Sequence, residues 1–203
     1  SQFLVTANIK GDRESHTIKS VLYFSNTTKP IVLQPTLAKT LSQHPYLELD
    51  GKRNVLRVKS GQWQVDSWLV VPEDFELIFP EGTTLYFKPS AGLLARGPVT
   101  IKGTKDRPVV LQGTKSPTKE NYWQGIFVMK SEAPSHWSHV QIKNTKGINN
   151  NEWVITAGVT FYQSDVHLKN VTFSGNRCED ALNIIRSTFD LIDVDIKNAI
   201  SDG

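Results

Sequence analysis

The chain of 203 residues carries 23 Lys and Arg against 20 Asp and Glu, a formal net charge of +3, and its basic residues are scattered. A mild, scattered charge argues against a nucleic-acid-binding protein, and no apolar run approaches the roughly 20 residues of a membrane span. The single cysteine, Cys178, excludes an internal disulfide and a cysteine-based metal site. With 38% apolar residues, the composition predicts a thin core, as in an elongated domain.

Residues 1–58 are expected to form a β-rich N-terminal segment. β-Branched and aromatic residues predict strands over Phe3–Ile9 and Thr17–Phe24. A turn is expected at Asn26–Pro30 and a short strand at Ile31–Leu33. These stretches do not show the repeat pattern of the rest of the chain.

Pro35–His44 is the one good helical candidate, because Leu37 and Leu41 recur at helical spacing and Pro45 follows. A helix of about ten residues is marginal alone. Placed on the first coil of a repeat domain, it would cover apolar side chains and free strand edges. We expect this capping role; the alternative is that the segment is the tail of an upstream domain.

The C-terminal part of the chain contains a 23-residue internal repeat, in which residues 157–176 align without a gap on residues 180–199. Apolar residues alternate along each copy, which indicates short strands rather than helices. Three short strands with polar corners are typical of one coil of a parallel β-helix, which buries its inward side chains only when another coil stacks on it. The aligned apolar pairs are Val159 with Leu182 (182 − 159 = 23), Phe161 with Ile184, Tyr162 with Ile185, Val166 with Phe189, Leu168 with Leu191, Val171 with Val194 and Phe173 with Ile196.

Short apolar stretches separated by Gly or Pro extend back to residue 59, so residues 59–203 are predicted to form the coils. Trp123–Asn144 fits as one coil, with offsets of 33 and 31 residues to the repeat (159 − 126 and 171 − 140). The polar insertions Thr114–Asn121 and Thr145–Glu152 either shape a groove on one side or are surface excursions. Because Gly203 follows a complete coil without a capping pattern, we expect the natural protein to continue with further coils or to pack against another copy.

The run Val71–Gly113, VPEDFELIFPEGTTLYFKPSAGLLARGPVTIKGTKDRPVVLQG, resembles the opening coils of bacterial right-handed parallel β-helix proteins. Those proteins repeat Gly-Thr before a strand, then Gly-x-Val/Leu-x-Ile-x-Gly-Thr, then Pro-Val/Ile-x-Leu/Phe. Trp123–Ile126, Val140–Asn144 and Asn176–Asn183 are similar to the same group. The resemblance implies the pectate-lyase-like fold, right-handed coils and a secreted or surface-exposed protein. Such motifs specify a fold well and an activity hardly at all.

The densest polar group of the sequence surrounds Asn183. Because the apolar neighbours of Asn183 are expected to point inward, its own side chain points outward, and Thr160 lies beneath it one coil earlier. Asp180 precedes this strand and Arg186 follows it, so we expect both to reach the same exterior face. A guanidinium suits a uronate carboxylate, while amide and carboxylate groups suit sugar hydroxyls. The pattern predicts an acidic-sugar site; the alternative is that Arg186 merely pairs with Asp180 or a neighbour.

Aromatic side chains would supply faces on which sugar rings stack. Tyr162 lies on the strand that carries Thr160 and joins the candidate substrate-binding residues. Tyr122 and Trp123 flank one polar insertion, and Trp153 flanks the other. An outward row of rings favours glycan binding; the alternative is that the tryptophans pack in the core or the cap.

A glycosidase would need paired carboxylates roughly 5 to 9.5 Å apart. Asp193 and Asp195 have the i, i+2 spacing that puts two strand residues on one face, and Glu179 with Asp180 is the other pair. Neutral side chains fill the positions of Asp193 and Asp195 one coil earlier, so a solvated face is the better interpretation. The sequence motifs of polygalacturonases and pectate lyases are absent, which weakens the case for either reaction. No catalytic residue is assigned.

No metal ligand set is predicted. His136 and His139 alone among the five histidines have metal-like spacing, and with Trp137 between them they are interpreted as a corner. No cofactor is expected, except Ca²⁺ if the protein is a lyase. Cys178 is interpreted as a buried structural thiol; the alternative is that Arg177 lowers its pKa.

The sequence therefore predicts an all-β protein: a right-handed single-stranded parallel β-helix with an N-terminal β-rich segment and a short capping helix. The expected function is that of a secreted or cell-surface bacterial module that binds carbohydrate or serves as a structural stalk. The alternative is a polysaccharide lyase or glycoside hydrolase acting on acidic polysaccharide. The expected partner is a polysaccharide or a cell-surface glycan.

Overall fold

The computed structural model describes residues 2–8, 10–11, 14–21, 36–114, 121–150 and 153–201. Internal contacts divide the chain into two units, residues 1–31 and residues 32–203. The turn expected at Asn26–Pro30, the strand expected at Ile31–Leu33 and most of the insertion Thr114–Asn121 lie outside the described residues. Within the described ranges, no helix is long and apolar enough to cross a membrane.

The first unit contains an antiparallel pair of strands, β1 (Gln2–Asn8) and β2 (Ser15–Val21). The hydroxyl groups of Thr6 and Thr17 lie 3.1 Å apart across the pair. Both strand predictions in this segment are confirmed, with β2 beginning at Ser15 rather than at Thr17.

In the second unit, helix α1 (Leu37–Gln43) confirms the one helical prediction. Thr36 is its N-cap, and the Thr36 hydroxyl accepts a hydrogen bond from the Lys39 amide at 3.3 Å. A helix this short needs tertiary contacts. The Thr40 hydroxyl supplies one, because it donates to the Val70 carbonyl oxygen at 2.9 Å.

The residue that ends the helix, His44, is buried and held as a neutral imidazole. Its Nε2 lies 3.1 Å from the Trp68 carbonyl oxygen, which only accepts, so Nε2 carries the proton. The Nδ1 atom lies 2.9 Å from the Tyr46 hydroxyl, which donates to it. Burial lowers the pKa of His44, and the hydrogen bond to Trp68 opposes this only in part.

We expect mild acid to destabilise the second unit through His44. A histidine with a lowered folded-state pKa contributes stability that is present above its unfolded value of 6.5 and is lost as the pH falls through the folded value. The free energy of unfolding in urea should therefore decline below about pH 6.5, and the His44→Gln variant should lose part of that decline. An equal decline in the variant would show that other groups cause it.

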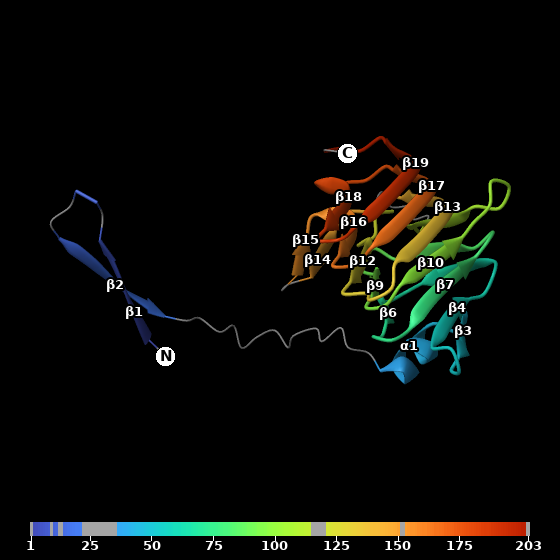
Figure 1. Cartoon of the computed structure of the whole chain (residues 1–203), viewed down its shortest axis with the longest axis horizontal. Coiled ribbons are helices and arrows are strands. Elements are labelled where there is room, and N and C mark those ends of the chain that lie inside the picture. Colours follow the sequence, from blue (N-terminus) through green and yellow to red (C-terminus); the bar gives the residue numbers. More distant parts are fainter. Residues whose placement is uncertain are drawn as a thin grey trace. The chain divides into compact units, whose positions relative to one another are not determined.

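Most of the remaining strands line three faces, and neighbouring strands within each face pair in parallel. The three longest strands bend, so that each contributes to two faces. The first face contains β4 (Val55–Val58), β7 (Glu76–Pro80), β10 (Val99–Lys102) and the N-terminal halves of β13 (Ser135–Lys143), β17 (Val166–Ser174) and β19 (Phe189–Lys197). The second face contains β5 (Gln62–Val65), β8 (Thr84–Phe87), β11 (Val109–Gly113) and the C-terminal halves of β13, β17 and β19. The third face contains β6 (Leu69–Val71), β9 (Leu93–Ala95), β12 (Ile126–Met129), β16 (Ala157–Tyr162) and β18 (Asp180–Ile185). Strand β3 (Leu47–Asp50) pairs antiparallel with β4, and Figure 1 shows the strands of the first face side by side, from β3 to β19.

The strand register confirms the offsets expected from the repeat. Val159 lies beside Leu182 in β16 and β18, and Phe173 lies beside Ile196 in β17 and β19, so the offset is 23 in both pairs. The offsets of 33 and 31 residues recur between β12 and β16 and between β13 and β17. The protein is thus predominantly β, with a curled and largely parallel strand arrangement, as the all-β prediction requires.

Three columns of residues in the left-handed conformation mark the bends between faces. They are Lys130, Gln163 and Arg186 after the third face, His139, Asn170 and Asp193 between the first and second, and Asn144, Gly175 and Asn198 after the second, all with φ between 49° and 65°. A left-handed residue turns the chain and interrupts the alternation of a strand. Leu168 and Val171, on either side of Asn170, are therefore both buried. Asn is tolerant of this conformation, which supports a structural role for the corner asparagines.

The inward side chains of the three faces form one continuous core. Phe87 stacks on Trp123 with ring centroids 4.0 Å apart, and Trp137 meets Phe161 edge-on at 5.2 Å. Both tryptophans are fully buried, and each ring nitrogen donates to a backbone carbonyl. For Trp123 and Trp137 the core-packing alternative is therefore correct.

The insertion Thr145–Glu152 contains a strand in its described part, where the sequence suggested a polar loop. Strand β14 (Ile148–Asn150) pairs antiparallel with β15 (Trp153–Ile155). Ile148 is buried in a second apolar cluster, on the outer side of the third face. The hairpin begins at Gly147, where there is no room for a side chain. Gly147 has φ of +77°, and a Cβ there would lie 2.7 Å from the Ile155 carbonyl oxygen.

Candidate functional site

Outward residues of the third face form a row across its five strands. In strand order, they are Val70, Leu94, Phe127, Thr160 and Asn183. The first three are apolar and buried, and they pack with Ile148 and Ile155 of the hairpin. The row becomes polar at its fourth member, so its two ends offer different chemistry.

A groove of about 220 Å³ opens at the polar end of this row. The lining residues are Phe127, Val154, Ile155, Thr156, Thr160, Tyr162, Asn183 and Ile185. Thr160, Tyr162 and Asn183, three of the residues proposed from the sequence, therefore lie together. The hairpin supplies Val154 and Ile155, which sequence reasoning missed because the insertion before them is rich in asparagine.

The Thr160 hydroxyl is the chemically unusual group of the groove. Thr160 is 2% exposed, and its Oγ1 has no hydrogen-bond partner within the described part of the chain. A buried hydroxyl left without a partner costs about 1 to 3 kcal/mol, and such groups are rare in folded proteins. Thr160 lines the groove, although its Oγ1 is itself closed off from solvent, so a polar group of a bound molecule would satisfy it once neighbouring side chains move aside.

Arg186 lies beside the groove, at the bend that follows β18, with φ of 51°. Its Nη1 donates to the Tyr162 hydroxyl at 3.4 Å, which is long for a hydrogen bond. Among the described residues, Arg186 forms no ion pair with Asp180 or any other carboxylate. The exposed guanidinium therefore keeps its remaining donors for another acceptor.

Asp180 lies at the opposite end of β18 from Arg186. Asp180 pairs with Ala157, and it does not line the groove. The structure thus brings Thr160, Tyr162, Asn183 and Arg186 together and leaves Asp180 apart.

Asp193 and Asp195, one of the two carboxylate pairs considered for glycosidase chemistry, do not lie on the same face. Asp193 has φ of 53° and lies at the bend in β19, whereas Asp195 follows on the second face. The expectation that their i, i+2 spacing gives a common face was wrong, because the left-handed residue breaks the alternation. Asp195 also lies 2.9 Å from the Lys197 ammonium, as a surface ion pair.

Cys178 is a buried free thiol two residues before β18, a strand of the third face. Its sulfur lies 3.6 Å from the Thr145 Oγ1, and burial raises the pKa of the thiol. Arg177 instead stacks over the Tyr122 ring, with its guanidinium carbon 4.3 Å from the ring centroid. A raised pKa suits a structural thiol and opposes the alternative that Arg177 activates it.

No family model, curated protein or solved structure matches this chain. Among the described residues, no group of three or more His, Cys, Asp or Glu side chains is arranged to hold a metal ion.

The Thr160→Val variant should be more stable than the parent protein in the absence of a ligand. Valine has the same shape without the unpaired hydroxyl, so the free energy of unfolding should rise by about 1 kcal/mol. Thermal and urea unfolding measure this directly. The matched control is Thr172→Val, outward on the second face, where a change within about 0.5 kcal/mol is expected. A loss of stability in Thr160→Val would mean that the hydroxyl already has a partner.

Proposed function

We propose that the second unit is a right-handed parallel β-helix. Support comes from the three faces of parallel strands, the offset of 23 residues shared by β16–β18 and β17–β19, and the three columns of left-handed corners. Stacked coils of this kind are quasi-one-dimensional, so each coil is stabilised mainly by its neighbours.

We further propose that the protein is a secreted or cell-surface bacterial module that binds acidic carbohydrate in the groove of the third face. Arg186 would pair with a uronate carboxylate, and Asn183 and Thr160 would bind sugar hydroxyls. The Tyr162 ring would support the face of a sugar. The observation that carries this proposal is the buried Thr160 hydroxyl, which lines the groove without a partner.

A glycan array screened with Ca²⁺ present tests this function. The parent protein should bind uronate-containing glycans. Arg186→Ala should weaken binding by about tenfold or more, as expected for a lost hydrogen bond to a charged group, and Asn183→Ala by about two- to tenfold, as expected for a neutral one. Thr160→Val should also weaken binding while raising stability, which separates a ligand contact from a folding defect. Thr172→Val should bind as the parent does.

Binding to no glycan by a protein with an intact circular dichroism spectrum would contradict the carbohydrate function and leave a structural stalk. Cleavage of a bound polysaccharide would instead favour the alternative, a lyase or hydrolase.

A partner is also proposed at the open edge formed by β18 and β19. Phe189, Leu191 and Ile196 are 61%, 40% and 39% exposed, and within the described residues each of these strands pairs on one side alone. Further coils or another copy of the chain would cover these apolar side chains. If another copy does so, sedimentation should show association that rises with concentration and that Phe189→Lys abolishes.

A further inference from the structure

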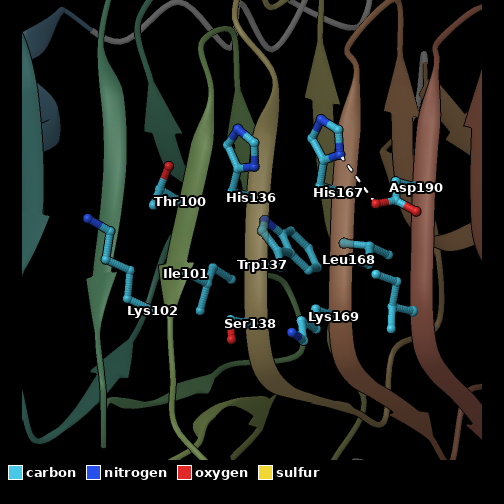
Figure 2. Close-up of a pocket in the computed structure, with 11 residues that line it drawn as sticks. Thr100, Ile101, Lys102, His136, Trp137, Ser138, His167, Leu168, Lys169 and Asp190 are labelled. Carbon is cyan, nitrogen blue, oxygen red and sulfur yellow. Dashed lines mark ion pairs between the residues drawn. The ribbon is translucent and has the colours of Figure 1, made fainter.

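The first face carries a second hollow on its outer side, of about 310 Å³. It spans β10, β13, β17 and β19, so it lies on a different face from the groove. Its outward lining residues form two rows across the strands, and Figure 2 shows both. The first row is Thr100, His136, His167 and Asp190, and the second is Lys102, Ser138, Lys169 and Ile192.

Two neighbouring histidine rings of the first row stack on each other. The imidazoles of His136 and His167 are parallel within 3°, with centroids 4.7 Å apart. The His167 Nδ1 lies 3.9 Å from the Asp190 carboxylate, the ion pair marked in Figure 2. His136 has no carboxylate partner within the described part of the chain, so it remains available to a ligand.

The second row places a short side chain between two long cationic ones. Ser138 lies beside Lys102 on one strand and Lys169 on the other. Neighbouring strands are about 4.8 Å apart, so the two lysine backbones are separated by about 10 Å across Ser138. Neither lysine forms an ion pair with a carboxylate of the described residues. Figure 2 shows the Lys169 ammonium next to Ser138 and the exposed Lys102 side chain extending away from it. An anion held over Ser138 would therefore meet Lys169 directly, and Lys102 would reach it by rotating its side chain.

We propose that this hollow binds the carboxylate or sulfate group of an acidic sugar. Lys102, Lys169 and the Ser138 hydroxyl supply donors for the oxyanion, and the imidazoles of His136 and His167 line the rest of the ligand. A hollow of about 310 Å³ is far larger than a bare inorganic ion requires, and it lies at the lower end of small-molecule sites. The stacked ring faces and the half-exposed Ile192 offer apolar surface to the carbon atoms of a sugar ring.

Substitution of Asp190 distinguishes a bound anion from a bound cation. Its carboxylate repels an oxyanion in the hollow, so Asp190→Asn should strengthen binding by about two- to fivefold, the range of an exposed charge interaction. For a cation held by His167 and Asp190, the same substitution would weaken binding.

Isothermal titration calorimetry with glucuronate and glucose 6-sulfate tests the inference. Both sugars should bind the parent protein, and Lys169→Gln or Ser138→Ala should weaken binding by about two- to fivefold. The matched control is Lys105→Gln, an exposed lysine outside the hollow that should leave affinity unchanged. The titrations are repeated in the Arg186→Ala background, which lacks the uronate contact proposed for the groove, so that the binding which remains there, and its loss in Lys169→Gln, belong to the hollow.

Four results would overturn the inference: weaker binding in Asp190→Asn, equal binding of neutral glucose, tighter binding of inorganic sulfate than of the sugars, or equal effects of Lys169→Gln and Lys105→Gln. Tight binding of zinc chloride that His167→Gln abolishes would replace it with a cation site. Binding of a DNA oligonucleotide in place of the sugars would replace it with a nucleic-acid site.

Discussion

Inward apolar side chains stay exposed unless the next strand of the same face covers them, and the rest of the structure depends on that parallel pairing. Leu168 and Leu191 occupy equivalent positions in neighbouring strands, yet Leu168 is 1% exposed and Leu191 is 40% exposed. The difference is the neighbouring strand: β17 is paired on both sides, whereas β19 pairs with β17 alone among the described strands. Burial of an inward side chain therefore depends on the adjacent strands as well as on its own.

The same strand pairing determines which outward side chains become neighbours. Because neighbouring strands of each face pair in parallel and the left-handed corners recur in columns, outward residues line up in rows across the strands, although the offset between paired strands ranges from 21 (76 − 55) to 36 residues (136 − 100). The groove joins Thr160 to Asn183, and the hollow joins His136 to His167; neither pair is close in the sequence. A single substitution in a row changes one member of a site without disturbing the core on the other side of the strand.

The register of the strands could be predicted from the sequence because the 23-residue repeat has no gap. The hairpin β14–β15 could not, because Ile148, which is buried, lies within a run of polar residues. The stack of His136 on His167 was missed because the 31-residue offset places them together, while sequence spacing favoured His136 with His139. The bend at Asp193 was also missed, since alternation alone does not show which residue adopts a left-handed conformation. Patterns that repeat along the chain were thus predictable, and local departures from them were not.

Disulfide cross-linking tests the stacking register most directly. In the Thr172→Cys/Asp195→Cys variant the two substituted residues are direct neighbours across β17 and β19, about 4.8 Å apart by strand spacing and within the range of a disulfide. The account predicts rapid bond formation under mild oxidation. The Thr172→Cys/Lys197→Cys variant, displaced by two positions and about 8 Å apart, should not form the bond. Equal cross-linking in both variants, or bond formation in the displaced pair alone, would contradict the register and with it both proposed sites.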